Sequence, residues 1–389
     1  MQCGKVSMTT SKQSSAHSEK DDAISSKFET RRKKIDEIDQ QLLVLINRRM
    51  AVAKEIGQIK GHKKTTIIDT KREAEVIQKL LNLNRGAELT RKSLFQIFTA
   101  VIAASREIQQ PQVQKSSERP VPELFAVIGN PVSHSMSPGM HNCAFSATGY
   151  NGLYLPLEIR DIQEAVSGLK TLNFKGASIT IPHKESIIDF LDAVDETAQR
   201  IGAVNTVVNS HGGLIGYNTD GTGAILALTE YTPIKDRHVA VIGAGGAARA
   251  IGFGLKTEGG RITIVNRSKD KGEKLAGDLN AKFIPLEEIR KISCDILVNT
   301  TPVGMTPRVD DMCVPKEVLD KHMVVMDIVY NPLKTRLLRK AEKAGCTTID
   351  GLSMFVHQGA GQFELWTGLA APVDMMRLAV LASLNETGV

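Results

Sequence analysis

The chain has 389 residues, which is more than one hydrophobic core usually organises, so we expect two or three domains. Its apolar content of 42% is ordinary, no run of about 18 apolar residues could span a membrane, and residues 1–22 lack the apolar core of a signal peptide, so we expect a cytoplasmic protein. The net charge of +6 comes mainly from the front, because residues 28–110 hold 17 Lys and Arg against 10 Asp and Glu, whereas residues 111–389 hold 28 against 30.

The five cysteines, at positions 3, 143, 294, 313 and 346, are scattered along the chain. They form neither a C-x-x-C motif nor a cluster with histidine. We therefore expect free thiols, without a disulfide framework and without a metal site.

The first part of the chain divides into three stretches. Residues 1–27 are rich in Ser, Lys and Thr and nearly free of apolar residues, which predicts disorder. Residues 28–110 have a helical pattern without proline: a helix from about 29 to 60 that Gly61 ends, a second from near Thr70, and a third from about Thr90 to Gln110. Residues 111–121 are expected to be a linker, because three prolines stand among residues 111–122.

The first of these helices has an arginine in its apolar stripe. In IDEIDQQLLVLINRRMAVAKEIGQI, apolar residues recur in steps of three and four at 35, 38, 42, 45, 52, 56 and 59, and Arg49 occupies the remaining position of the series. Lys60 lies eleven residues further on, on the same stripe. A buried, unpaired cation would cost several kcal/mol. Arg49 could snorkel or meet a structural carboxylate, or it could bind an anion.

Further polar residues favour the anion. They lie near the apolar faces of the predicted helices, at Arg32, Asp69, Arg72, Glu73, Ser105 and Gln109. A polar pocket inside a helical bundle, biased toward cations, suits a small dianion better than a structural role.

At these residues the segment 28–110 resembles the all-helical type of chorismate mutase. The resemblance implies an all-α domain in which Arg32 and Arg49 bind carboxylates and Lys60 and Gln109 donate to the ether oxygen. It assigns the remaining substrate contacts to Asp69, Arg72, Glu73 and Ser105. These assignments are consistent with the chemistry. A pericyclic rearrangement needs no nucleophile. It needs a substrate held in its reactive conformation and hydrogen-bond donors directed at the charge that develops.

The spacing of Arg32 and Arg49 bears on the oligomeric state of the protein. Arg32 and Arg49 are separated by about 25 Å along one helix, too far to bind one small ligand together. If both serve one site, one of them comes from a second chain, so we expect a homodimer with shared sites. There are two alternatives. A basic module that binds nucleic acid is disfavoured, because the cations lie partly on the apolar stripe and no aromatic platform accompanies them, so we expect no nucleic-acid partner. A dimerisation or effector module without catalysis stays open.

From Glu123 onward, strand-like runs alternate with helical stretches. The runs are LFAVIG, GASITI, HVAVIG, RITIVN, DILVNT and VVMDIV, and the alternation predicts a parallel α/β architecture.

A dinucleotide-binding turn is predicted at HVAVIGAGGAARAIG, where Gly243, Ala244, Gly245, Gly246 and Ala247 stand between a strand and a helix. In this G-x-G-x-x-A pattern, glycines let the backbone approach a pyrophosphate at the helix N-terminus. The next strand ends not in an acid, which NAD would require, but in NRSKDK. The residues Asn266, Arg267, Ser268 and Lys271 would accept a 2′-phosphate, so we predict NADP.

Other polar residues follow strands of the preceding region. They are Ser133 and Ser135 in GNPVSHSMSP, Thr180 and Lys184 in ITIPHK, and then Asn205 and Asp220. Lysine beside aspartate is an acid/base pair suited to interconverting a ketone and an alcohol, and the hydroxyls and amides would bind a polyol. Taken singly, Ser133 could cap a helix, Lys184 could lie on the surface and Asp220 could start a turn.

Together these motifs resemble shikimate dehydrogenase over residues 122–389. The resemblance implies a substrate-binding domain at 122–220, a Rossmann NADP-binding domain at 221–350, and C-terminal helices at 351–389 that return to the substrate domain. It makes Lys184 and Asp220 catalytic, and it assigns substrate contacts to Ser133, Ser135, Thr180, Asn205, Tyr330 and Gln358. Ile328 and Gly351 fall where the family places the nicotinamide.

The sequence departs from the family pattern at two places. Ser178 stands where an asparagine is usual, and Thr301-Pro302 in NTTPVGM replaces a small-residue version near the expected cofactor. Neither change removes a catalytic group. The two resemblances predict a bifunctional enzyme that converts chorismate to prephenate and reduces 3-dehydroshikimate to shikimate with NADPH. A quinate/shikimate dehydrogenase that uses NAD is the alternative for the second activity.

Overall fold

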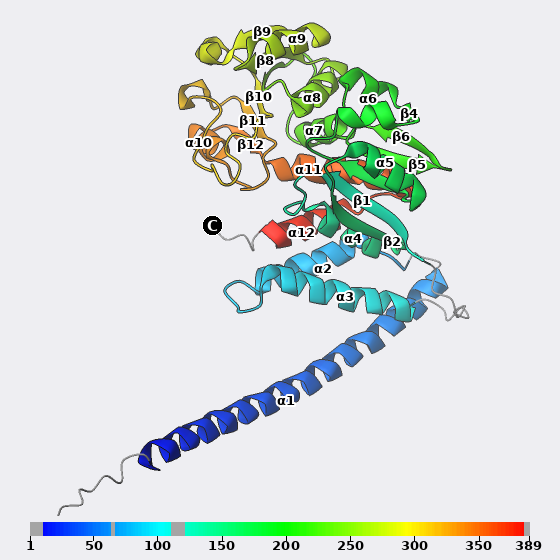
Figure 1. Ribbon diagram of the computed structural model, residues 1–389, viewed down its shortest axis with the longest axis vertical. Coiled ribbons are helices and arrows are strands. Elements are labelled where there is room, and N and C mark those ends of the chain that lie inside the picture. The colour runs from blue at the N-terminus through cyan, green and yellow to red at the C-terminus, as the bar shows by residue number, and fades with distance from the viewer. Residues whose placement is uncertain (1–10, 64–66, 110–120, 385–389) are drawn as a thin grey trace, which may run out of the picture. The chain divides into compact units, whose positions relative to one another are not determined.

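The structure is a computed structural model that describes residues 11–63, 67–109 and 121–384, with only the backbone at 11–24 and 62–63. By its internal contacts the chain divides into two compact units, Met1–Ile67 with Ala100–Gln114, and Ile68–Thr99 with Lys115–Val389. Figure 1 shows the helices and strands of both. None of the described helices is long and apolar enough to cross a membrane.

The first unit contains α1 (Ser11–Lys63) and the last part of α3 (Arg91–Gln109). The helix α1 begins earlier than predicted and continues through Gly61, so residues 11–27 are helical rather than disordered, while residues 1–10 lie outside the described residues. The sequence explains this extension, because neither glycine nor proline interrupts residues 5–56. Gly57 lets α3 approach, since a Cβ there would lie 2.9 Å from the Cα of Gln109.

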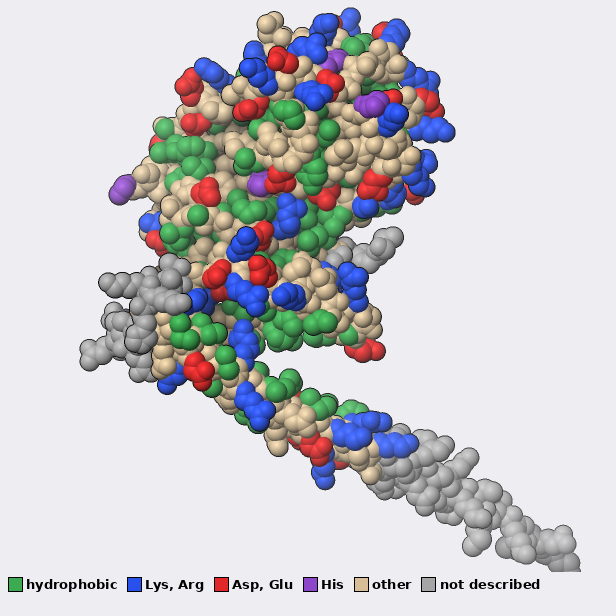
Figure 2. Space-filling view, turned by 180° about the vertical axis from the view of Figure 1, so that it is seen from behind, with side chains coloured by type: hydrophobic (Ala, Val, Ile, Leu, Met, Phe, Trp, Pro, Cys, Tyr) green, Lys and Arg blue, Asp and Glu red, His purple; other side chains and the backbone are tan. Residues whose placement is uncertain are grey.

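The apolar stripe of α1 is exposed in the single chain, although a buried stripe was expected. Its exposed fractions run from 43% at Ile56 to 58% at Leu45. Figure 2 shows apolar side chains on the surface of this helix. Because α1 has 53 residues, the described part of α3 in the same unit is too short to cover it.

The second unit includes α2 (Thr70–Leu83), which was predicted to belong to the helical domain alone. Asp69 caps this helix by accepting a hydrogen bond from the backbone N–H of Arg72. Its buried face consists of Ala74, Ile77 and Leu81. The helix lies against α12 (Val373–Leu384), which explains why the division of the chain does not follow the predicted boundary at residue 110.

One six-stranded sheet of the second unit is built from residues 123–217. Its strands lie in the order β2-β1-β3-β5-β6-β4. Their bounds are β1 (Glu123–Gly129), β2 (Gly152–Glu158), β3 (Gly176–Ile179), β4 (Ala193–Val194), β5 (Thr206–Ser210) and β6 (Gly213–Tyr217). The intervening helices are α4 (Ser137–Thr148), α5 (Ile162–Thr171), η1 (Ser186–Phe190) and α6 (Glu196–Ile201).

This sheet is mixed rather than wholly parallel as the sequence predicted. Strand β5 pairs antiparallel with both β3 and β6. The antiparallel pairing of β5 with β6 follows from the turn between them, where His211 has φ +54° and Gly212 has φ +91°. Two successive residues with positive φ favour the tight hairpin turn that joins antiparallel strands.

The other sheet is parallel throughout, in the order β12-β11-β10-β7-β8-β9. Its strands are β7 (His238–Ile242), β8 (Arg261–Asn266), β9 (Lys282–Pro285), β10 (Ile296–Asn299), β11 (Val324–Asp327) and β12 (Thr347–Ile349). The helices of this region are α7 (Asp220–Thr229), α8 (Gly246–Thr257), α9 (Lys269–Leu279), η2 (Leu286–Lys291), η3 (Lys316–Val318) and α10 (Arg336–Ala344).

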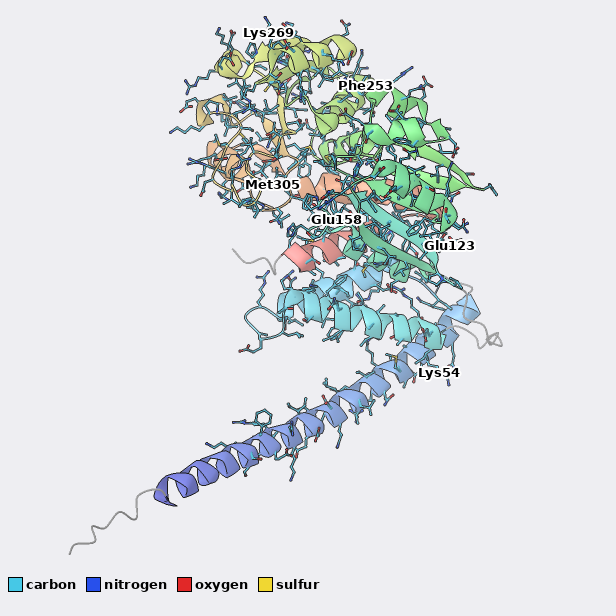
Figure 3. The ribbon with its side chains drawn as sticks, viewed as in Figure 1. Lys54, Glu123, Glu158, Phe253, Lys269 and Met305 are labelled. Atoms are coloured by element: carbon cyan, nitrogen blue, oxygen red, sulfur yellow. The ribbon has the colours of Figure 1, made fainter. Side chains whose placement is uncertain are left out.

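Two sets of contacts join the sheets within this unit. Helix α11 (Gly351–Thr367) packs against α7, and buried residues of α11 and α12 share a core with β1 and α4. A smaller cluster joins α6 to α8 through Ile201, Ala203, Ala250 and Phe253, the last of which Figure 3 labels together with Lys269 at the start of α9.

Candidate active sites

The carboxyl ends of β1 and β3 lie side by side and carry the first group of predicted residues. The two strands are parallel neighbours, and a Cβ on Gly129 would lie 2.3 Å from the Cγ2 of Thr180. Ser133 is exposed in the segment after β1, and the hydroxyl oxygen of Ser135 accepts a hydrogen bond from the backbone N–H of Ser137 at 3.3 Å. This edge is where open α/β sheets bind their ligands.

Lys184 and Asp220 form a direct ion pair. The Nζ of Lys184 lies 2.6 Å from the Oδ2 of Asp220, with exposed side-chain fractions of 25% and 9%. Asp220 is the first residue of α7, so its carboxylate stands at the positive end of a helix. The carboxylate is thus well placed to orient an ammonium group that solvent can still reach.

Asn205 holds the carboxylate from the other side. Its amide nitrogen donates to the Oδ1 of Asp220 at 2.8 Å and to the hydroxyl oxygen of Thr219 at 2.9 Å. The amide nitrogen also lies 3.4 Å from the side-chain oxygen of Gln358 in α11. Residues from four segments therefore meet around Asp220, and the sequence had predicted Lys184, Asn205 and Gln358 among them.

Tyr330 lies in the segment after β11 and is half-buried. Its ring stacks on that of Phe355, with centroids 4.6 Å apart, and burial raises the pKa of its hydroxyl. This places the predicted tyrosine against α11, the helix that also carries Gln358.

Several polar residues beneath this site were not predicted from the sequence. Gln362, Ser178, Thr206, Tyr154 and His141 are buried and joined to one another by hydrogen bonds. One signal was available, because Gln358 and Gln362 stand four residues apart and so share a face of α11. Ser178, where the family usually has asparagine, belongs to this network.

The glycine-rich turn after β7 fits a dinucleotide pyrophosphate. Gly243 has φ +120°, and a Cβ there would lie 2.5 Å from the hydroxyl oxygen of Thr300, so the turn requires glycine. A Cβ on Gly245 or Gly246 would meet no atom within 4 Å, which leaves the surface open above the start of α8. Because no side chain caps α8, its first N–H groups are available to a phosphate.

The end of β8 presents the residues predicted for the 2′-phosphate. Arg267, Ser268 and Lys271 are exposed, and the side-chain amide of Asn266 donates to the backbone oxygen of Ser268 at 2.8 Å. Arg267 and Lys271 are two exposed cations at this end of the strand, and they suit a phosphate on the ribose. The residues present therefore fit NADP.

The predicted nicotinamide residues lie against each other. A Cβ on Gly351 would lie 2.4 Å from the backbone oxygen of Ile328, so the first turn of α11 touches the segment after β11. The unusual Thr301 is held locally: its backbone N–H and its hydroxyl both donate to the side-chain oxygen of Asn299. Asn299 in turn donates to Asp327, whose pKa burial raises to about 6.

In the helical unit, Arg49 is half-buried and its guanidinium donates to neutral oxygens. One is the hydroxyl of Ser105, and the other is the backbone oxygen of Val101 at 3.3 Å. The buried side-chain oxygen of Gln109 has no hydrogen-bond partner among the described residues. Three of the residues predicted for chorismate, Arg49, Ser105 and Gln109, thus lie along the contact between α1 and α3.

The other predicted residues of α1 lie apart from this contact. The Nζ of Lys60 donates to the backbone oxygen of Ile67 at 2.8 Å. Arg32 is exposed, pairs with Glu29 at 2.9 Å and stacks over the ring of Phe28. In one chain, therefore, Arg32 is not brought to Arg49.

Three predicted residues belong to the second unit, in the first turn of α2 or just before it. Asp69 is the cap described above, Arg72 pairs with Glu75 at 3.1 Å, and Glu73 is half-buried. Their proximity to one another follows from the helix.

Comparisons with known families agree with both regions. Residues 31–110 match the chorismate mutase type II family. Residues 127–207 match the shikimate dehydrogenase substrate binding domain, residues 225–353 match shikimate/quinate 5-dehydrogenase, and residues 351–381 match the shikimate 5′-dehydrogenase C-terminal domain.

Individual proteins give the same result. A shikimate dehydrogenase (NADP(+)) of Moorella thermoacetica is 45% identical over 268 residues, which cover 65% of this chain and 90% of that protein. The structure of shikimate 5-dehydrogenase from Thermus thermophilus with NADP(H) and shikimate is 38% identical, with a TM-score of 0.63 over 67% of this chain and 99% of that one.

A fusion protein is also similar. The chorismate mutase/shikimate 5-dehydrogenase fusion protein from Clostridium acetobutylicum is 31% identical, with a TM-score of 0.65 over 68% of this chain and 99% of that one. The chain therefore belongs to the shikimate dehydrogenase family, and it carries a chorismate mutase type II domain in front of its dehydrogenase domains.

Proposed function

We propose that the chain is a bifunctional enzyme that rearranges chorismate to prephenate and reduces 3-dehydroshikimate reversibly to shikimate with NADPH. The observation that carries the second activity is the contact between Lys184 and Asp220 at 2.6 Å, at the edge of a sheet where ligands bind. We also propose that the enzyme acts in the cytoplasm.

The chain's part in the reduction is to deliver a proton and to orient the ketone. Bound NADPH supplies the hydride. The ammonium group of Lys184 gives its proton to the carbonyl oxygen, which becomes the hydroxyl of the product, and Asp220 directs the ammonium group toward that oxygen. Because the Lys184 side chain is 25% exposed, solvent can return the proton after each turnover.

The hydroxyl groups at the sheet edge suit the rest of the substrate. Ser133 and Ser135 follow β1, where they can donate to the substrate carboxylate, and Thr180 follows β3. Asn205, Tyr330 and Gln358 are assigned to the ring hydroxyls. A quinate/shikimate dehydrogenase that uses NAD is less consistent with Arg267 and Lys271, because two exposed cations favour the 2′-phosphate.

For the rearrangement, the contact between α1 and α3 supplies donors without a general base. Arg49 is satisfied by neutral oxygens rather than by an internal acid, so its charge is available to a carboxylate of the substrate. Among the residues that the structure describes, the side-chain oxygen of Gln109 has no hydrogen-bond partner, which supports a role for this amide in binding a ligand. Asp69, Arg72 and Glu73 of the α2 region are assigned to the same substrate by the family resemblance.

The single chain leaves this second site incomplete, and a homodimer would complete it. Arg32 and Arg49 are about 25 Å apart on one helix. The stripe of α1 between and beyond them is exposed, with Leu42 at 50% and Val52 at 55%. A long helix with an exposed apolar stripe is stabilised when a second helix of similar length packs against that stripe.

Complementation tests the shared site. The variants Arg32→Ala and Arg49→Ala are each expected to lose mutase activity. A mixture refolded from equal amounts should regain about a quarter of the wild-type rate, because half of the dimers combine the two variants and one of their two sites is intact. A mixture as inactive as its components would contradict sharing, and a monomer in sedimentation would contradict the dimer itself.

A direct assay tests the two activities. Purified protein should consume chorismate without cofactor and, separately, oxidise shikimate with NADP⁺ much faster than with NAD⁺. If the helical domain is only a dimerisation or effector module, chorismate is not turned over while the dehydrogenase remains active.

A further inference from the structure

A chain of buried hydrogen bonds runs beneath the Lys184–Asp220 pair, and Gln362 of α11 lies at its centre. The side-chain nitrogen of Gln362 lies 3.0 Å from the backbone oxygen of Asn205 and 3.1 Å from the hydroxyl oxygen of Thr206. A backbone oxygen only accepts, so the amide nitrogen of Gln362 faces Asn205 and its amide oxygen faces the other way.

The groups on that other side agree with this orientation. The side-chain oxygen of Gln362 accepts from the hydroxyl of Ser178 at 2.8 Å and lies 3.3 Å from the Nε2 of His141. Since Ser178 gives its proton to Gln362, it accepts from Tyr154 at 2.6 Å. Complete burial lowers the pKa of His141 to about 3, so its ring is neutral and carries its proton on Nε2.

The chain of hydrogen bonds continues toward the active site. Thr206 accepts from Gln362, so it donates its own proton to the side-chain oxygen of Asn205 at 2.7 Å. The backbone N–H of Thr219 donates to that oxygen as well, at 2.8 Å. Because two donors occupy the oxygen, the nitrogen of the Asn205 amide is turned toward Asp220.

We propose that Gln362 is a positioning residue for the dehydrogenase reaction, acting through Thr206 and Asn205 on the carboxylate of Asp220 and so on the direction of the Lys184 ammonium group. Gln362 is 2% exposed and lies behind Asn205, so it acts without touching the substrate. The inference rests on the proposed reduction of 3-dehydroshikimate.

Without Gln362, the hydroxyl of Thr206 loses the donor that sets its direction, and the backbone N–H of Thr219 is left as the main donor that holds the side-chain oxygen of Asn205. The hydroxyl of Thr206 would be free to rotate away, and the amide could turn so that its oxygen faces the carboxylate, where it repels. A rate that depends on alignment falls when the aligned state is less populated. Ser133, Ser135 and Thr180 do not bond to this chain of residues, and Asn205 is only one of the residues assigned to the substrate, so the loss should appear more in kcat than in KM.

The first experiment uses the full-length variant Gln362→Met, which keeps the volume of the side chain and removes its hydrogen bonds. We expect kcat for 3-dehydroshikimate to fall about tenfold, and KM for this substrate and for NADPH to change less than about threefold. The control Met376→Leu is a buried, volume-conserving change in α12, and it should keep the wild-type kcat within about twofold. Gln362→Met with the kcat of this control would overturn the proposal.

The second experiment tests the route through Thr206. The variant Thr206→Val should lower kcat about as much as Gln362→Met, whereas Thr206→Ser, which keeps the hydroxyl, should retain most of it. The double variant should lose little more than the larger single loss, because both changes break one chain of bonds. Additive losses would overturn the proposal, and the Thr206 pair alone decides the matter if Gln362→Met does not fold.

Wild-type protein is assayed first, which distinguishes failure of the proposed function from failure of the role proposed for Gln362. No reduction by wild type would overturn the proposed function together with this inference. An active wild type with unaffected Gln362 and Thr206 variants would overturn the inference alone.

Discussion

The two candidate sites differ in how much of each one chain supplies. In the dehydrogenase region, Lys184, Asp220 and Asn205 come from separate segments, yet hydrogen bonds of 2.6 and 2.8 Å join them. In the helical unit, Arg49 reaches Ser105, whereas Arg32 is exposed and paired with Glu29 on its own helix.

The difference follows from the elements that carry the residues. Neighbouring strands bring the ends of distant segments to one edge, so a sheet gathers a site from a single chain. A helix separates its residues by about 1.5 Å per position, so a long helix disperses a site unless other helices complete it. The dehydrogenase should therefore depend on one protomer and the mutase on two.

Loss of Lys184, the proposed proton donor, should have the largest effect. In Lys184→Ala, reduction of 3-dehydroshikimate should fall by about 10²- to 10⁴-fold, the range for removing a general acid. Chorismate turnover should stay at the wild-type rate. A spectrophotometric assay of NADPH consumption and a separate assay of chorismate absorbance measure the two outcomes.

Lys175→Ala provides the matched control for this variant. Lys175 lies just before β3, is partly exposed, and pairs with Glu123 at 3.7 Å, so its removal should change neither rate by more than about twofold. If Lys184→Ala reduced the ketone at the rate of this control, Lys184 would not be the proton donor.

Removing Arg49, the half-buried cation of the helical unit, should lower the mutase activity and leave the dehydrogenase activity unchanged. In Arg49→Ala, mutase activity should fall about a hundredfold, because a charge-assisted contact to the substrate carboxylate is lost, while the dehydrogenase rate should be unchanged. The neighbouring Arg48 is exposed, so Arg48→Ala is the control and should keep both activities. A mutase rate in Arg49→Ala equal to that of the control would refute the assignment of Arg49.

Much of the second unit could be predicted because its signals are local. Each strand-like run became a strand, and the turn that begins at Gly243 stands between β7 and α8 as the glycine spacing indicated. The fold class and the use of NADP are confirmed by the family matches and relatives. Site motifs that directly follow strands could be identified from the sequence, because the sheet topology places the ends of neighbouring strands at one edge.

The remaining features depend on partners that are distant in sequence. Gln362 lies 156 residues from Thr206, with which it bonds, and only its spacing from Gln358 hinted at a polar face of α11. The antiparallel pairing of β5 with β6 depends on the positive φ of His211, a residue type that does not by itself predict such a turn. The start of α1 at Ser11 was missed because polar composition was interpreted as disorder, although nothing in the stretch interrupts a helix.

The smallest effect is expected at the cofactor, and it tests whether one protomer also carries the specificity for NADP. Arg267 is exposed at the end of β8, where it can bind the 2′-phosphate. In Arg267→Ala, the ratio of kcat/KM for NADPH to that for NADH should fall about tenfold, which corresponds to one charge-assisted contact of ~1.4 kcal/mol. Lys274→Ala removes an exposed cation further along α9 and should leave the ratio unchanged. If Arg267→Ala kept the wild-type ratio, the preference for NADP would have to come from Asn266, Ser268 or Lys271, and the same measurement on Lys271→Ala would identify that cation.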